Sequence, residues 1–239
     1  MSGPAAVAPP IAGGGLTGTL EERFAAGQTF PEFLAAAVAN ADLWRAVYAR
    51  ARVEDASLAR ATALGGAWHL LVLVEDWCGD AVNTLPVLGR LAELAPNIDL
   101  RVLGRDANLD LMDAHLTNGS RSIPVVMVLD ATYRERGWWG PRPAALQAWV
   151  MSDGRTFTKE DRYREVRRWY ARDHGATTVN EILALLAQAA GAVTTAVGGV
   201  VPSEVASDVA LPAARDPGAA ATADGSGVRA PALPSPPTG

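Results

Sequence analysis

Cysteine is almost absent from this sequence, in which Cys78 is the only one among 239 residues. A single thiol cannot form an intramolecular disulfide bond, and this absence favours a reducing compartment. Residues 1–15 also lack the basic segment and the apolar core that a secretion signal requires. We therefore expect a cytoplasmic protein.

An excess of positive charge is missing as well. The chain has 21 Lys and Arg residues against 26 Asp and Glu residues, a formal net charge of −5, so its overall charge does not favour nucleic acid as a partner. Residues 182–201 carry no formal charge and have the length of a membrane span. They are mostly Ala and Gly, however, and they continue an amphipathic helix from Thr178, so we expect no membrane partner either.

The two ends of the chain are rich in Ala, Gly and Pro. Such segments bury too little apolar surface to fold, so residues 1–19 and 191–239 are predicted to be disordered tails. Residues 20–190 are predicted to form one folded domain. Periodicity and breakers within it predict helices that begin near residues 21, 30, 40–42 and 54, a strand over 98–103, a helix over 108–116, a strand pair within 122–138, and helices over 144–151 and within 153–190.

The last helical region contains two patterns with specific expectations. Tyr163, Val166, Trp169 and Tyr170 are predicted to form the buried side of an arginine-rich helix. Its arginines alternate with acidic residues, which is typical of a solvated helix face. The alternative is that these arginines bind an anionic partner. Thr177 or Thr178 is predicted to cap the final helix, with Glu181 three residues beyond Thr178.

Cys78 lies in the stretch around which the chain is organised. Residues 70–74 form an uninterrupted apolar run that predicts a strand covered on both faces, and residues 80–94 have helical spacing. Cys78 is therefore predicted to lie where a strand ends and a helix begins. Unpaired N–H groups and the helix dipole favour a thiolate there.

Three motifs resemble the thioredoxin family. The sequence Trp77-Cys78-Gly79 between a strand and a helix resembles the family's active-site corner, Ile123-Pro124 resembles the pair that precedes a later strand, and Trp138-Trp139-Gly140 resembles the loop that closes the groove. The chain resembles a bacterial thioredoxin-like protein whose active-site motif, here residues 77–81, contains a single cysteine. The resemblance implies an α/β thioredoxin-like fold, in which helices flank a central mixed sheet of about four strands, with extra helices at both ends.

The same resemblance implies the roles of the site residues. Cys78 would be the catalytic nucleophile, and Pro124 would be cis and lie against its sulfur. The backbone of Ile123 would align the substrate. The remaining groove residues would be Trp77, Gly79, Asp80, Trp139 and Gly140.

Two departures from the family pattern limit the chemistry. The family's dithiol motif is Cys-x-x-Cys, but Ala81 occupies the position of the second, resolving cysteine and Asp80 occupies the position of the usual proline. Val72 occupies the position of the buried acid that helps to deprotonate the resolving thiol. Internal dithiol chemistry is therefore excluded.

Two functions remain compatible with these residues. The first is a single-thiol oxidoreductase, whose partners are protein or small-molecule thiols and disulfides and whose resolving thiol is external. The alternative is a redox-inactive module that binds a peptide or protein in the same groove, since a fold alone does not establish activity. The acidic residues Glu75, Asp76 and Asp80 would raise the pKa of Cys78 and the helix would lower it, so the sequence leaves the direction open.

Other chemistry of Cys78 is less well supported. A shared iron–sulfur cluster would require a glutathione-binding set that is not evident after Pro124. A mononuclear site from Asp76, Cys78 and Asp80 has too few soft ligands, and a peroxidase would need a resolving thiol from elsewhere. We expect neither a metal nor a cofactor.

Overall fold

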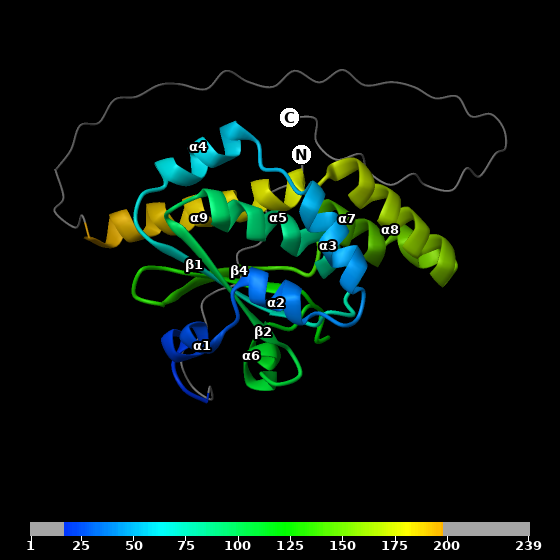
Figure 1. Cartoon of the computed structure of the whole chain (residues 1–239), viewed down its shortest axis with the longest axis horizontal. Helices are drawn as coiled ribbons and strands as arrows, with labels where there is room; N and C mark the ends of the chain where they lie inside the picture. Colours follow the sequence, from blue (N-terminus) through cyan, green and yellow to red (C-terminus); the bar gives the residue numbers. More distant parts are fainter. Residues whose placement is uncertain (1–16, 198–239) are drawn as a thin grey trace, which may run out of the picture.

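A four-stranded sheet forms the centre of the protein. The structure is a computed structural model, and it describes residues 17–197 (Figure 1). The strands lie in the order β2-β1-β3-β4, with β1 parallel to β2 and β3 antiparallel to both β1 and β4. Their bounds are β1 Trp68–Val74, β2 Ile98–Gly104, β3 Val125–Leu129 and β4 Glu135–Trp139. The predicted α/β fold with a mixed sheet of four strands is confirmed.

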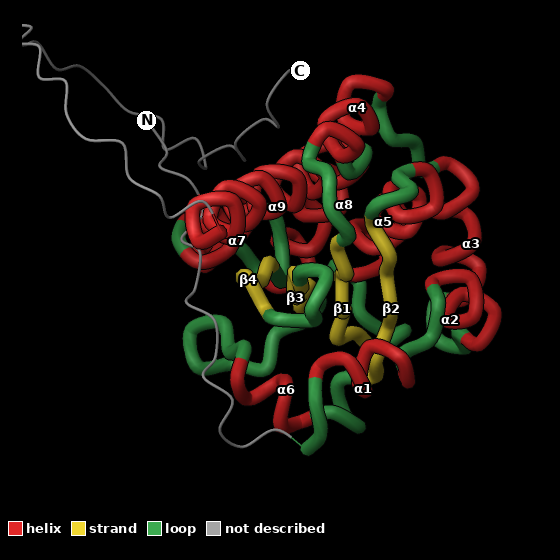
Figure 2. The backbone as a smooth tube through the Cα atoms, turned by 90° about the vertical axis from the view of Figure 1, so that its left-hand side faces the viewer, coloured by secondary structure: helices red, strands yellow, loops and turns green. Residues whose placement is uncertain are grey.

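Helices cover both faces of this sheet. They are α1 Leu20–Ala26, α2 Phe30–Ala36, α3 Ala41–Arg50, α4 Asp55–Ala63, α5 Ala81–Leu94, α6 Leu109–Ala114, α7 Ala144–Met151, α8 Lys159–Asp173 and α9 Ala176–Val197, with a short 3-10 turn at Asp153–Thr156. Figures 1 and 2 show α5 and α9 on one side of the strands and α1 and α6 on the other. All residues of β1 except His69 are buried, as its apolar run predicts.

Two capping boxes determine where the first helices begin. Thr19 and Glu22 bond to each other's backbone N–H groups at the start of α1, and Thr29 and Glu32 do the same at the start of α2. Both helix starts are as predicted. Between the helices, Gln28 exchanges two backbone hydrogen bonds of 2.8 and 2.9 Å with Val102. This pairing protects the outer edge of β2 from association with another chain.

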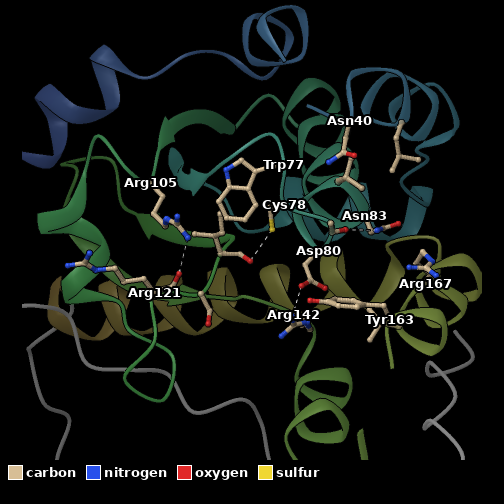
Figure 3. A pocket seen from close by; sticks show the side chains of 16 residues that line it. Asn40, Trp77, Cys78, Asp80, Asn83, Arg105, Arg121, Arg142, Tyr163 and Arg167 are labelled. Atoms are coloured by element: carbon tan, nitrogen blue, oxygen red, sulfur yellow. Dashed lines mark hydrogen bonds and ion pairs between the residues drawn. The ribbon is translucent and has the colours of Figure 1, made fainter. Parts of the chain in front are cut away.

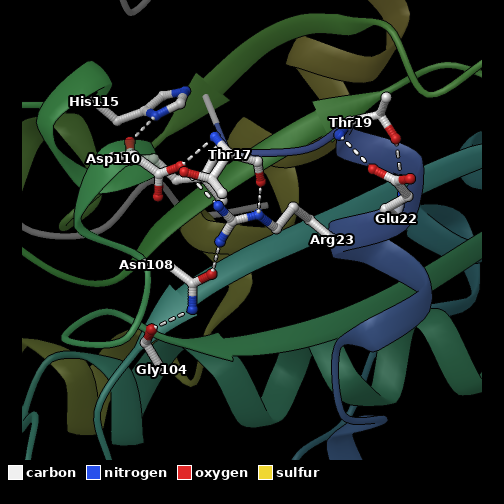
Figure 4. Close-up of polar contacts among 9 residues, drawn as sticks. Thr17, Thr19, Glu22, Arg23, Gly104, Asn108, Asp110 and His115 are labelled. Atoms are coloured by element: carbon white, nitrogen blue, oxygen red, sulfur yellow. Dashed lines mark hydrogen bonds and ion pairs between the residues drawn. The ribbon is translucent and has the colours of Figure 1, made fainter. Parts of the chain in front are cut away.

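A polar cluster fastens α1 to α6 (Figure 4). The guanidinium of Arg23 pairs with Asp110 at 2.7 Å and also donates to the side chain of Asn108. Asp110 accepts a backbone hydrogen bond from Thr17 at 2.8 Å, and this bond is the main reason why the pKa of Asp110 is lowered. Thr17 and Thr19, assigned from composition to a tail, therefore make specific contacts with the domain.

The connection between α8 and α9 differs from its prediction. The helix α9 begins at Ala176, so Thr177 and Thr178 lie inside it, and the predicted cap at either residue is wrong. The carboxylate of Asp173 accepts the backbone N–H of Thr177 instead. The chain reverses there because His174 and Gly175 both have positive φ.

The C-terminal predictions lie partly beyond what the structure describes. Helix α9 continues to Val197, past the predicted domain limit at residue 190. Residues 1–16 and 198–239, which make up most of the two predicted tails, lie outside the described residues, as does the end of the stretch 182–201. Within residues 17–197, no helix combines the length and the apolar character needed to cross a membrane.

A buried ion pair joins α6 to β4. His115 is 1% exposed, and its Nε2 lies 3.0 Å from a carboxylate oxygen of Glu135 while its Nδ1 lies 2.6 Å from the carbonyl of Leu111. Only the protonated imidazole can donate to both acceptors. Burial lowers the pKa of His115, but these two partners outweigh burial, and the pKa is raised overall.

Stability should therefore decrease as the pH rises past neutrality. The folded pKa of His115 lies above the unfolded value of about 6.5, so its contribution is complete below that pH and is lost as the pH rises through the folded value. Replacing His115→Leu leaves Glu135 without its partner and should lower the free energy of unfolding by about 3 kcal/mol at pH 6. Urea unfolding from pH 5.5 to 9 measures both effects, and an unchanged profile in the variant would contradict the assignment.

Candidate functional site

The structure brings two of the three predicted motifs together at Cys78. Cys78 lies between β1 and α5, where its N–H donates to the carbonyl of Glu75 and its carbonyl accepts from Val82. Its side chain is 6% exposed, and Sγ lies 3.3 Å from the carbonyl oxygen of Ile123. The peptide bond between Ile123 and Pro124 is cis. The segment before β3 thus lies against the sulfur.

A cavity of about 370 Å³ adjoins Cys78 (Figure 3). Helices α3, α5 and α8 contribute to its wall, together with the loops that connect α2 to α3, β1 to α5, β2 to α6, α6 to β3 and β4 to α7. The lining residues are Asn40, Leu43, Trp77, Cys78, Gly79, Asp80, Val82, Asn83, Arg105, Arg121, Ser122, Ile123, Arg142, Tyr163, Val166 and Arg167. The sulfur therefore faces a space large enough for a small ligand.

The carboxylates of two nearby acidic residues accept hydrogen bonds from backbone N–H groups. The carboxylate of Asp76 accepts the N–H groups of Val38 and Ala39, both at 2.8 Å, and thereby holds the loop between α2 and α3 beside the site. The side chain of Val38 in this loop is exposed to solvent. The carboxylate of Glu75 accepts the N–H of Asp106 at 2.9 Å.

The third acidic residue, Asp80, lies in a partly buried network. One oxygen pairs with Arg142 at 2.6 Å, and the other accepts the phenol hydrogen of Tyr170 at 3.0 Å. Arg142 also donates to Gln147. Burial and the charge of Asp80 raise the pKa of Tyr170 well above its ordinary value, so this phenol stays protonated as a donor.

Burial dominates the ionisation of Cys78. It raises the pKa of the thiol, and the charge of Asp80 raises it further. The N–H groups of Ala81 and Asp80 and the guanidinium of Arg142 lower the pKa without cancelling the effect of burial. The direction that the sequence left open is therefore upward, and the resting form is a thiol that donates to Ile123.

The predicted groove residues occupy different positions. Trp77, Gly79, Asp80 and Ile123 line the cavity, and the ring of Trp77 is half exposed, with the guanidinium of Arg105 5.0 Å from its centre. Pro124, Trp139 and Gly140 do not line it.

Trp139 and Gly140 have roles behind the cavity. Trp139 is 6% exposed, and its Nε1 donates to Glu181 of α9 at 2.6 Å. Glu181 also accepts the N–H of Ala144, the first residue of α7, so it connects β4, α7 and α9 and forms no capping box with Thr178. Gly140 lies directly against the backbone carbonyl of Pro124.

Sequence analysis missed the cationic part of the cavity. Arg105, Arg121 and Arg142 come from loops whose positions only the tertiary structure sets. Arg167 belongs to α8, whose arginines the sequence had indicated as a possible anion contact. Tyr163 of the same helix is 46% exposed at the cavity, and its predicted burial is wrong, whereas Val166, Trp169 and Tyr170 are buried as predicted.

The structure offers no convincing metal site beside the sulfur. Among residues 17–191, no group of three or more His, Cys, Asp and Glu side chains could hold a metal ion. Of the triad considered from the sequence, Asp76 accepts two N–H groups and Asp80 pairs with Arg142. Their oxygens therefore already have partners within the protein, and none of these is a metal ion.

Comparisons with known proteins agree with this fold. Solved structures similar to this chain include a protein of unknown function from Pseudomonas aeruginosa, with 22% identity, a TM-score of 0.57 and coverage of 72% of this chain and 99% of that chain. Another is an HIV epitope-scaffold, with 23% identity, a TM-score of 0.56 and coverage of 71% and 98%. No match was found among the curated proteins. A family model described as Thioredoxin matches residues 27–164, which is more than half of the chain. The chain belongs to the thioredoxin family.

Proposed function

We propose that this protein exchanges thiols and disulfides through Cys78 alone, with an external thiol completing each cycle. The observation that carries the proposal is the position of Sγ. It lies at the N-terminal end of α5, against the carbonyl of Ile123 and on the wall of the cavity. A substrate sulfur in this cavity would meet the only thiol of the chain.

The exchange needs no second cysteine in the protein. The Cys78 thiolate, formed by loss of its proton to solvent, attacks one sulfur of a disulfide. A bond forms between Sγ and that sulfur while the substrate S–S bond breaks, and its electron pair leaves with the second sulfur as a thiolate that takes up a proton. An external thiolate then attacks the substrate sulfur of the mixed disulfide and releases Cys78.

The raised pKa of Cys78 affects the rate of thiol–disulfide exchange but does not prevent the reaction. A higher pKa reduces the thiolate fraction at neutral pH, but it also makes each thiolate a stronger nucleophile. Arg142 lies close enough to lower the pKa of the thiol, and its charge would stabilise the thiolate. The exchange rate should rise with pH until the raised pKa is passed.

The second candidate is a redox-inactive binding module. The observation in its favour is the same burial of Cys78, which keeps the resting sulfur protonated and bonded to Ile123. In such a module the cavity would bind its ligand without covalent chemistry. The partner would then depend on Trp77, Tyr163 and the arginines.

One experiment separates the two candidates. The full chain is incubated with bis(hydroxyethyl) disulfide across pH 6 to 10, and the adduct is followed by mass spectrometry. Thiol exchange predicts one adduct on Cys78, a rate midpoint above the free-thiol value of about 8.5, and complete release by excess small thiol. Cys78→Ser should form no adduct.

The unfolded chain provides the control for accessibility. In denaturant Cys78 reacts as a free thiol, so the ratio of folded to unfolded rates, each corrected for its thiolate fraction, reports the folded site alone. A folded rate more than about a thousandfold below the unfolded rate would exclude the oxidoreductase. The binding module would then remain.

A further inference from the structure

We infer that the cavity beside Cys78 takes low-molecular-weight disulfides that carry carboxylate groups, and that Arg167 is the main carboxylate-binding residue. The inference rests on the proposed thiol exchange and names its substrate class. Four arginines and one carboxylate, Asp80, line the cavity. This local excess of positive charge contrasts with the net charge of −5 of the whole chain.

Three of the four arginines already have protein partners. Arg105 pairs with Asp106 at 2.7 Å, Arg121 forms two bonds with Asp113, and Arg142 pairs with Asp80. Their carboxylate partners reduce the charge that remains for a ligand.

Arg167 differs from the arginines next to it on α8. Arg164 pairs with Asp161 and Arg168 pairs with Glu165, so these two belong to the predicted solvated face. In the part of the chain that the structure describes, Arg167 has no carboxylate partner, and it lies on the cavity wall. A guanidinium binds a carboxylate with two parallel hydrogen bonds, so an anionic group is its natural complement.

The positions of the charges suit a disulfide with an anion at each end. Figure 3 shows Cys78 between Arg105 and Arg121 on one side and Arg167 on the other. A carboxylate at Arg167 would direct the attached carbon chain past Asn83 towards the sulfur. The second carboxylate of a symmetrical disulfide would then lie on the side of Arg105 and Arg121.

The size and walls of the cavity favour a small molecule over a protein segment. Its volume of about 370 Å³ is near the lower end of the range for small-molecule sites. Trp77 and Tyr163 present half-exposed rings that can cover a short carbon chain. Helix α8 contributes Val166 and Arg167 to one wall, which restricts the space for an extended polypeptide.

A pair of probes that differ only in charge tests the inference. Dithiodipropionate and its neutral diamide have the same carbon chain. The ratio of their reaction rates with Cys78 is divided by the ratio of their reaction rates with free mercaptoethanol. We expect this normalised ratio to exceed about ten at low ionic strength and to fall with added salt. Arg167→Gln should reduce this normalised ratio about fivefold to tenfold.

Arg164→Gln is the matched control, because it removes a charge from the same helix outside the cavity. It should leave the ratio within about twofold of the intact protein. A ratio near one in the intact protein, or an equal loss in both variants, would overturn the anionic substrate class. The reaction with the diamide would still support thiol exchange.

A binding measurement keeps the inference testable if Cys78 reacts with neither probe. A failure to react would exclude the proposed thiol exchange. Binding would then be measured by titrating the Cys78→Ser chain with dithiodipropionate and following its amide signals by NMR. Arg167-dependent shifts of amide signals around the cavity would support carboxylate binding. Their absence, or equal shifts with the diamide, would overturn it.

Discussion

Replacing Gly140→Ala is expected to lower the free energy of unfolding by about 3 kcal/mol or more. The φ angle of Gly140 is +139°, which side-chain-bearing residues rarely adopt. A Cβ atom there would lie 2.1 Å from the carbonyl oxygen of Pro124 and 3.1 Å from its carbonyl carbon. Both neighbouring atoms are backbone, so no side-chain rotation relieves the clash. Chemical denaturation monitored by tryptophan fluorescence measures the loss.

Gly79→Ala is the control for this substitution, because Gly79 also lies in the candidate site. A Cβ atom at Gly79 would meet nothing within 4 Å, so the cost should stay within about 0.5 kcal/mol. Gly140→Ala should also change the rate at which Cys78 is alkylated, because a shift of Pro124 also shifts the Ile123 carbonyl that Sγ contacts. Equal stability of the two variants would contradict the close approach of Gly140 and Pro124.

Local patterns predicted the central elements of the fold. The apolar run before Cys78 predicted β1, and helical spacing after it predicted α5, because burial and periodicity act within one segment. Local signals also predicted the helix starts near residues 21 and 30, where the structure has capping boxes at Thr19 and Thr29. The cap at Thr178 failed because α9 begins at Ala176, two residues earlier, where the carboxylate of Asp173 accepts the N–H of Thr177.

Long-range positions could not be predicted from such patterns. Trp138 and Trp139 are adjacent in β4 and face opposite sides of the sheet, where Trp138 contacts the ring of His115 and Trp139 bonds to Glu181. The register of β4 decides which of the two tryptophans lies on the face of the sheet that α9 covers. Arg142 and Arg167 reach the cavity only because α7 and α8 fold back beside Cys78, and no local motif encodes that return.

Replacing Ala81→Cys is expected to change how many thiol equivalents the protein releases from dithiobis(nitrobenzoate). The intact chain should release one equivalent of thionitrobenzoate and remain a mixed disulfide, because it has no resolving thiol. Ala81 is the first residue of α5, and its N–H lies near enough to lower the pKa of the Cys78 thiol. A thiol at this position would attack the mixed disulfide from within the chain, and a second equivalent should follow.

The second release should be slower than the first and still far faster than release by a dilute external thiol. Intramolecular attack gains an effective concentration of many orders of magnitude over a dilute reagent when the geometry is favourable. Ala81 is buried, however, and Val72 is a buried apolar residue where the family resemblance places an acid. The new thiol would therefore lose its proton reluctantly.

Absorbance of thionitrobenzoate counts the equivalents, and mass spectrometry identifies the product as an internal disulfide. Ala81→Ser is the control, and it should behave as the intact chain does. If Ala81→Cys also stopped at one equivalent, the position of residue 81 relative to Sγ would be wrong. Two equivalents together with an internal disulfide, rather than two separate mixed disulfides, would instead establish that a single missing sulfur separates this site from a dithiol centre. The strand, the helix start and the Ile123 segment around Cys78 would then already have the required arrangement.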